Sequence, residues 1–253
     1  MAAPVAGRDD DAIAHLPTTS ESGRRGRVAG PALGAGLLAG LSVPPAGWWP
    51  LGLVGVGLAG ALLAGRPART RALIGFSAGI GLYGITLIWL TQFNFFGGLL
   101  VIALESGFLA LAAVATPEGR GRIVAWPAAL AATTALRTVF PFGGLPMGGV
   151  ELGQAAGPLA PAARLGGPLL LIAVTTAAGV ALEMLVRRRL VAGAVALALA
   201  VVLPIAGGAA RDGRVVGSLR VAAVQAGGRR GLRAVDNPPV LVYQAQLQAD
   251  ARL

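Results

Sequence analysis

The chain has 253 residues, of which 55% are hydrophobic and only 13% are charged, and it contains no cysteine. A soluble domain usually has about a quarter of its residues charged, so this composition favours a membrane protein and excludes a disulfide framework, a thiolate metal site or a cysteine nucleophile within the sequence. The net charge of +10 comes from arginines in short clusters between apolar runs, a pattern of membrane topology rather than of one nucleic-acid-binding patch.

The first 27 residues form a polar segment with three consecutive aspartates, and it ends in an arginine cluster. This composition predicts a disordered cytoplasmic tail over residues 1–27. A cleaved signal peptide is the alternative, because a basic region does precede an apolar one, but the segment is long and acidic for that role. The single histidine, His15, lies in this tail and is expected to be solvated rather than to bind a metal.

Seven apolar segments follow the tail, and most of them approach the ~17–25 residues that a membrane-spanning helix needs. The second is short and is expected to use flanking residues. The segments cover about residues 28–44, 51–65, 72–91, 95–116, 122–139, 167–186 and 189–206. They predict a seven-helix transmembrane domain over residues 28–206.

Arginines alternate between the two sides of these segments. One side holds the tail and the connections after the second, fourth and sixth segments, with Arg8, Arg24, Arg25, Arg27, Arg66, Arg69, Arg71, Arg120, Arg122, Arg187, Arg188 and Arg189. The opposite connections up to residue 206 hold only Arg137 and Arg164. Because cytoplasmic connections carry the excess of positive charge, the pattern predicts seven spans with the N-terminus inside and residues 207–253 outside.

The character of the chain changes after residue 206. Residues 207–217 form a Gly-rich polar linker, and Ser218–Gln225 is predicted to be a short strand because it is rich in valine and alanine. After a loop, Asn237 is a candidate cap for a helix that has Pro238 at its first position. A strand, a loop and a helix are how an α/β domain opens, so we expect residues 218–253 to be the truncated start of one.

Glycine patterns in the apolar segments predict close helix packing rather than nucleotide binding. Gly79–Gly84 matches G-x-G-x-x-G, the fingerprint of dinucleotide-binding sites. Such a site needs a preceding strand and an aqueous phosphate-binding position, and an apolar segment provides neither. Small residues four apart let membrane helices approach each other closely. Such pairs occur at Gly30 and Gly34, Gly36 and Gly40, and Gly75 and Gly79.

Glu105 lies near the middle of the fourth segment. A charge there costs ~2.5–3.5 kcal/mol on the insertion scale, whereas the large apolar residues of the segment return ~3–6 kcal/mol, so insertion is still favourable. We expect Glu105 to face the bundle interior, protonated or bonded to Ser106 or to another helix. Its role is either functional, as for many intramembrane acids, or a structural polar contact. Glu183 is expected to form an interfacial ion pair with Arg187.

The longest interruption between apolar segments, Phe140–Gly167, contains the most family-specific sequence motif of the chain. Its Pro141–Gly148, PFGGLPMG, resembles the PFGGFPWG of the apolipoprotein N-acyltransferase family, particularly of its actinobacterial members. The same resemblance continues in Gly153-Gln154, Gly157-Pro158-Leu159, Pro44-Pro45, Trp48-Trp49, Gly75-Phe76, Trp89, Leu136-Arg137 and Val221–Gln225. Met147 stands where the family usually has Trp, and Thr134 stands where a Glu commonly precedes the Leu-Arg pair.

The resemblance implies seven transmembrane helices followed by an extracytoplasmic nitrilase-like (carbon-nitrogen hydrolase) domain, in a multi-pass protein of the bacterial plasma membrane. It implies transfer of an acyl chain from a phospholipid to the N-terminal amine of diacylglyceryl-cysteine apolipoproteins. The catalytic Glu, Lys and Cys of the family are expected beyond Leu253, so no catalytic residue, metal or cofactor is predicted here. As substrate-binding residues we expect Trp89, Phe142, Pro146 and Gln154, because the loop would line the opening for lipid tails.

A non-catalytic membrane anchor, a degenerate or split relative of the family, is the alternative reading. Such an anchor would hold a partner protein at the membrane. A polyprenol mannosyl transferase is one such partner, because in actinobacteria this family's domain can be joined to that enzyme or work beside it. A small transporter is a third reading, and the single mid-membrane acid and the lack of an evident internal repeat argue against it. Nucleic acid is not an expected partner.

Overall fold

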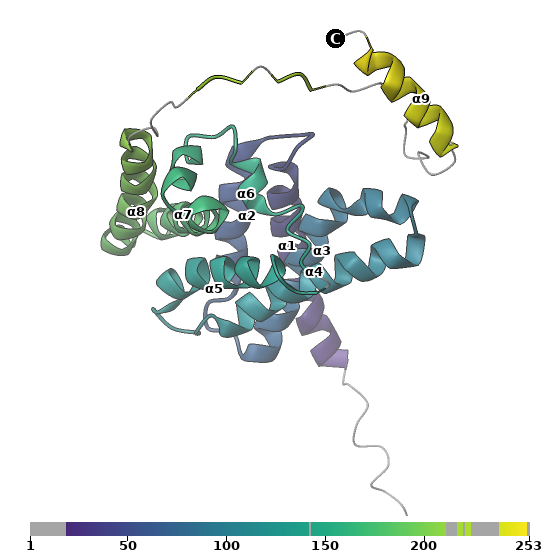
Figure 1. The fold of residues 1–253 in the computed structure, drawn as a ribbon. Coiled ribbons are helices and arrows are strands. Elements are labelled where there is room, and N and C mark those ends of the chain that lie inside the picture. The colour runs from purple at the N-terminus through teal and green to yellow at the C-terminus, as the bar shows by residue number, and fades with distance from the viewer. Residues whose placement is uncertain (1–18, 142, 211–216, 220, 224–237, 252–253) are drawn as a thin grey trace, which may run out of the picture.

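The computed structural model describes residues 19–141, 143–210, 217–219, 221–223 and 238–251, and their ordered elements are helices (Figure 1). The longer helices between residues 19 and 209 form a bundle, and α6 and two short 3-10 helices lie in its connections. The elements are α1 (Thr19–Leu41), α2 (Trp49–Leu62), α3 (Ala68–Thr86), η2 (Ile88–Gln92), α4 (Phe95–Ala115), α5 (Arg122–Arg137), α6 (Val150–Gly153), η3 (Ala160–Ala162), α7 (Ala163–Val186), α8 (Leu190–Ala209) and α9 (Pro239–Asp250).

Each of the seven predicted apolar segments contains a helix. In the described part of the chain, three helical stretches are long and apolar enough to cross a membrane: Phe95–Ala115, Ala160–Val186 and Leu190–Ala209. The apolar part of α1 (Arg27–Leu41) and α2 are shorter, while α3 and α5 contain arginines and threonines that lower their hydropathy. The chain is thus a helical membrane protein, and seven spans stay a prediction.

The two ends of the chain match the sequence expectations only in part. Helix α1 begins at Thr19, inside the predicted tail, and residues 1–18 with His15 lie outside the described residues. Residues 217–219 and 221–223 form no strand, and the rest of the predicted strand is not described. Helix α9 confirms the predicted C-terminal helix, whose proposed cap Asn237 is also outside the described residues.

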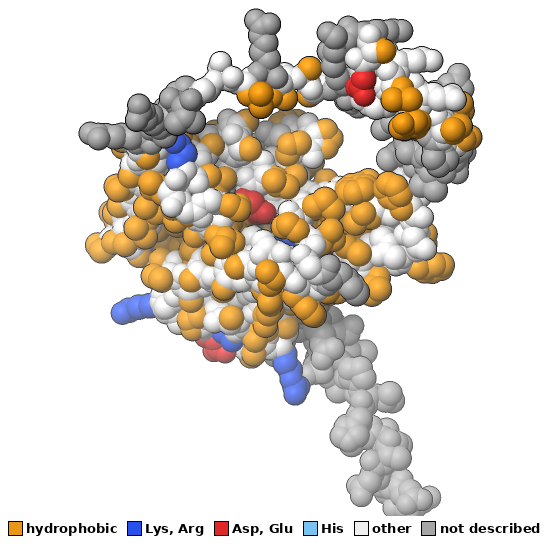
Figure 2. Space-filling view, viewed as in Figure 1, with side chains coloured by type: hydrophobic (Ala, Val, Ile, Leu, Met, Phe, Trp, Pro, Cys, Tyr) orange, Lys and Arg blue, Asp and Glu red, His pale blue; other side chains and the backbone are white. Residues whose placement is uncertain are grey.

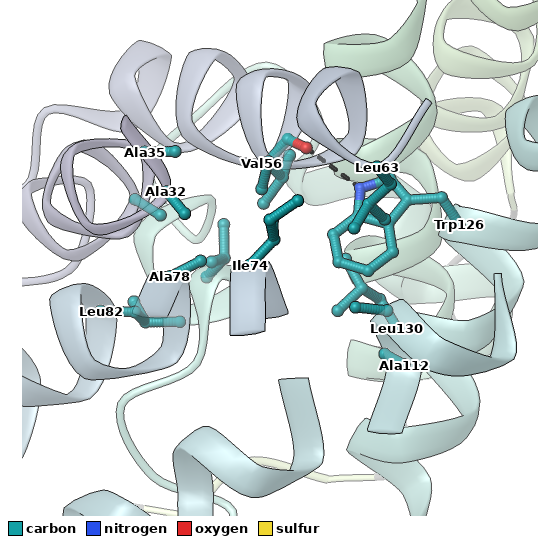
Figure 3. Close-up of a cluster of buried hydrophobic side chains, with 14 of the residues drawn as sticks. Ala32, Ala35, Val56, Leu63, Ile74, Ala78, Leu82, Ala112, Trp126 and Leu130 are labelled. Atoms are coloured by element: carbon teal, nitrogen blue, oxygen red, sulfur yellow. Dashed lines mark hydrogen bonds between the residues drawn. The ribbon is translucent and has the colours of Figure 1, made fainter. Parts of the chain in front are cut away.

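Small residues bring the helices of the bundle together. Helix α3 packs against both α1 and α4, and α7 packs against α2, α5 and α8. Figure 3 shows alanines of α1 and α3 close together on one side of the core, and on the other side Trp126, which donates its indole N–H to the Val56 carbonyl at 3.0 Å. Gly36 and Gly79 lie at close helix contacts, as predicted, whereas Gly30 and Gly34 have open space beside them.

One end of the bundle is joined by a buried ion pair. Arg122 at the start of α5 donates two hydrogen bonds to the Glu183 carboxylate of α7, at 2.8 and 2.9 Å, and a third to the Gly60 carbonyl of α2 at 2.8 Å. The predicted pair of Glu183 with Arg187 is confirmed at 3.0 Å. Since the Arg122 and Glu183 side chains are almost fully buried, this network fixes three helices to one another.

We expect Gly79→Ala to destabilise the bundle, because a Cβ at Gly79 would lie 2.5 Å from the Cα of Ser106 on α4. Overpacking of this kind costs about 1–3 kcal/mol. Gly84→Ala is the matched control, since no heavy atom outside its own helix turn lies within 4 Å of that position, and alanine should stabilise the helix by about 0.5–1 kcal/mol. Thermal unfolding in detergent measures both variants. Equal melting temperatures for Gly79→Ala and the parent protein would contradict the close contact.

Candidate functional site

A second buried ion pair joins α4, α5 and the long connection that follows α5. The Glu105 carboxylate accepts a hydrogen bond from Nε of Arg137, and both side chains are shielded from solvent. The guanidinium also donates to the Met147 carbonyl at 2.8 Å, and it lies 4.9 Å from the ring centroid of Tyr83 on α3. Glu105 thus faces the bundle interior and bonds another helix, one of the predicted alternatives, whereas Ser106 bonds the Ile102 carbonyl.

The structure corrects the interpretation of Arg137 as a loop charge. Arg137 is the last residue of α5, and only 2% of it is exposed. Its charge is neutralised inside the bundle, because an unpaired guanidinium would be expensive to bury there. Arg164 is then the remaining arginine of the two that the sequence placed on the outer side of the membrane. It donates a hydrogen bond to the Ala210 carbonyl at 2.9 Å.

A second carboxyl group, Glu151, lies near the Arg137 guanidinium. It belongs to the short helix α6, in the connection between α5 and α7 and outside the long helices, and it is 7% exposed. Burial raises the pKa of the Glu151 carboxyl, and a backbone hydrogen bond and the attraction of Arg137 offset this effect only in part. Sequence reasoning missed Glu151, because no local pattern relates a glutamate in a Gly/Pro-rich loop to an arginine at a helix end.

The loop that resembles the family motif folds back over the end of α3. The Leu145 N–H donates to the Arg137 carbonyl at 3.0 Å, which closes the chain on the end of α5. Gly148 has a φ of 72°, in the left-handed region that favours glycine. A Cβ at Gly148 would also lie 2.5 Å from Oγ1 of Thr86. A glycine is therefore required for this loop to lie on α3.

A largely apolar groove of about 350 Å³ lies where this loop meets the ends of the helices. It is lined by Val43, Pro44, Thr86, Leu87, Trp89, Met147, Gly148 and Leu152. The Trp89 indole N–H donates to the Thr86 carbonyl at 3.1 Å, which fixes the ring at the rim. Trp89 and Met147 are each 37% exposed. Such a groove suits an apolar chain better than a charged ligand.

A small cavity of about 30 Å³ lies deeper, next to the charged cluster. Its polar lining includes Tyr83, Thr134, Arg137 and Glu151, and the remainder is apolar, with residues such as Val56. The volume is sufficient for a water molecule, which needs polar partners of this kind. Thr134, which departs from the family pattern, therefore lies beside the buried arginine.

The predicted substrate-binding residues have different positions. Trp89 lines the groove, and Pro146 is exposed beside it in the loop. Gln154 is fully buried, and its side-chain amide donates to the Trp49 carbonyl at 3.0 Å, so it joins the loop to the start of α2. Phe142 lies outside the described residues. Sequence reasoning missed Thr86 and Leu87, which carry no motif of their own.

No group of three or more His, Cys, Asp or Glu side chains in the described ranges is arranged to hold a metal ion. Of the two buried carboxyl groups, Glu105 is paired with Arg137, and Glu151 is attracted by the same guanidinium. The arrangement is thus an apolar groove backed by a neutralised ionic cluster.

More than half of the chain matches a known protein family. The family model of the apolipoprotein N-acyltransferase N-terminal domain matches residues 35–181. The matched range begins in α1 and ends in α7, so it contains the groove, the loop and the Glu105–Arg137 pair, while Glu183 of the other pair lies two residues beyond it.

Glu151 should make the stability of the protein depend on pH. Its pKa is raised in the folded state, so the folded protein holds the proton more tightly than the unfolded protein does. The free energy of unfolding therefore falls as pH rises from the unfolded pKa of about 4.3 through the folded pKa. The loss is at most about 1.4 kcal/mol per pH unit. Glu151→Gln should remove this loss. Thermal unfolding at pH 5 and pH 8 measures it, with Glu118→Gln, at an exposed side chain, as control. An unchanged pH dependence in Glu151→Gln would refute this role.

Proposed function

The chain belongs to the apolipoprotein N-acyltransferase family, and we propose that it forms the membrane part of such an enzyme. The reaction transfers an acyl chain from a phospholipid to the N-terminal amine of a diacylglyceryl-cysteine lipoprotein. The observation that carries the proposal is the family match over residues 35–181. The catalytic Glu, Lys and Cys of the family belong to its nitrilase-like domain, so this chain contributes lipid binding and membrane anchoring.

The groove supports this division of roles. Both substrates carry acyl chains, and the groove is lined mainly by apolar side chains from the α1–α2 connection, the end of α3 and the loop. Exposed tryptophan side chains lie in it or near it along the sequence, with Trp89 37% and Trp48 62% exposed. The amphipathic rings of tryptophan settle at the membrane–water interface. The loop would then border the opening through which a phospholipid tail reaches the catalytic domain.

The arginine distribution supports the orientation in the membrane. The Gly65 N–H donates to the Glu118 carbonyl at 3.3 Å, and Arg122 pairs with Glu183, so the connections after α2, α4 and α7 lie at one end of the bundle. Figure 2 shows arginine side chains projecting mainly from the lower end of a surface that is otherwise largely hydrophobic. We propose seven spans in the bacterial plasma membrane, with this end cytoplasmic and the groove on the outer side.

Replacing Trp89 tests the lipid-binding groove in the protein that carries its catalytic domain. Trp89→Ala should lower kcat/KM for the phospholipid donor about tenfold, equivalent to about 1.4 kcal/mol of lost contact. Phe96→Ala removes a nearby, more exposed ring that does not line the groove, and it should have little effect. N-acylation of a diacylglyceryl peptide by purified variants is the measurement. Equal losses in both variants would argue against the groove. Absence of activity in the parent protein would favour the anchor alternative.

Cysteine labelling tests the orientation, because the parent chain has no cysteine. Ala68→Cys and Pro146→Cys place single thiols at exposed positions of α3 and of the loop. A membrane-impermeant maleimide added to intact cells should label position 146, whereas position 68 should react only after the membrane is opened. Labelling of both positions from the same side would contradict the proposed orientation.

A further inference from the structure

Arg137 has contacts that reach from the ion pair to the groove. Nε bonds Glu105, Nη2 bonds the Met147 carbonyl, and the guanidinium lies over the Tyr83 ring. Met147 lines the groove with its neighbour Gly148. We infer that Glu105 and Arg137 are positioning residues: the pair sets the place of the Met147 wall of the groove and thereby tunes binding of the lipid tail. The inference rests on the proposed role of the groove.

The loop is held from two sides at this point. Behind it, the Arg137 guanidinium bonds the Met147 carbonyl at 2.8 Å, while the Met147 N–H donates to the Leu145 carbonyl at 2.8 Å. In front, Gly148 lies against Thr86 so closely that a Cβ would clash. A shift of the guanidinium would therefore move the Met147 side chain relative to Trp89, which also lines the groove.

Glu105 decides where the guanidinium points. Arginine presents its donors in a rigid planar fork, so bonding Nε to one carboxylate fixes the direction of Nη2. A second carboxyl group, Glu151, also interacts electrostatically with Arg137 and lines the same small cavity. Without the Glu105 charge, Glu151 would be the acid of this pair of glutamates that still attracts the guanidinium. Arg137 would then turn toward α6, which carries Glu151, and away from the Met147 carbonyl.

The other buried ion pair of the bundle, Arg122–Glu183, provides a matched control. Arg122 and Glu183 also join two helices through a guanidinium and a carboxylate, with side-chain exposures of 6% and 7%. Glu183 contacts Arg122 and Arg187, and neither lines the groove. Glu183→Gln therefore removes a comparable buried charge from the bundle without touching the loop. It separates loss of stability from loss of loop position.

A thiol at position 147 reports the loop position without any need for activity. Met147→Cys gives a single-cysteine protein and leaves the backbone carbonyl in place. In membrane vesicles, combining it with Glu105→Gln should raise the rate of maleimide labelling severalfold, whereas combining it with Glu183→Gln should leave the rate unchanged. Arg137→Lys, which keeps the charge opposite Glu105 but lacks the fork, should also raise it, and it serves as the second variant if Glu105→Gln fails to insert.

The same substitutions without the cysteine separate positioning from catalysis in the protein that carries its catalytic domain. Glu105→Gln should raise KM for the phospholipid donor severalfold with little change in kcat, Glu105→Asp should restore part of the loss, and Glu183→Gln should change neither constant. An unchanged labelling rate at position 147 in Glu105→Gln and Arg137→Lys, or equal changes in Glu105→Gln and Glu183→Gln, would overturn the inference. A parent protein without N-acylation would overturn the proposed function, while the labelling rates would still decide the positioning role.

Discussion

The buried pair of Glu105 and Arg137 determines how α4, α5 and the long loop meet. Neither charge is tolerable alone in an apolar bundle, since removing one partner of a buried pair typically costs about 3–5 kcal/mol. The pair therefore forces the end of α5 against the middle of α4. The donors that Glu105 leaves free on the guanidinium are directed at the loop backbone, where the Met147 carbonyl accepts one of them. Because the same guanidinium neutralises Glu105 and bonds the Met147 carbonyl, the buried ion pair also constrains the backbone at the groove.

The rest of the bundle is held by contacts that do not depend on the hydrophobic effect between helices. Lipid is as apolar as leucine, so helices in a membrane associate through close packing and polar bonds. Both occur here. Gly79 allows α3 to approach α4 closely, and Trp126 bonds the Val56 carbonyl of α2. The Arg122–Glu183 pair then fixes the opposite end of α5 to α7. Helix α5 is consequently anchored by an ion pair at each end.

Local features of the sequence predicted the helices well, whereas they did not predict the contacts between residues far apart in the chain. Hydropathy is a property of neighbouring residues, so all seven helical segments were found. The acid in α4 was predicted to face inward, but its partner Arg137 was counted with the loops because a helix end and a loop look alike in sequence. The packing of Gln154 under α2 and the position of Glu151 depend on the fold of the Gly/Pro-rich connection. No periodicity describes such a connection.

Met147 shows how the groove can change while the loop keeps its place. The contact that holds the loop uses the Met147 carbonyl, which every residue type provides, and the turn depends on the neighbouring Gly148. The side chain is therefore free to vary. Methionine is unbranched and flexible, so it forms a softer wall than the Trp of the family pattern that this loop resembles. The arrangement separates two tasks: the ionic cluster and the glycine fix the backbone, and the side chain at position 147 shapes the space facing Trp89.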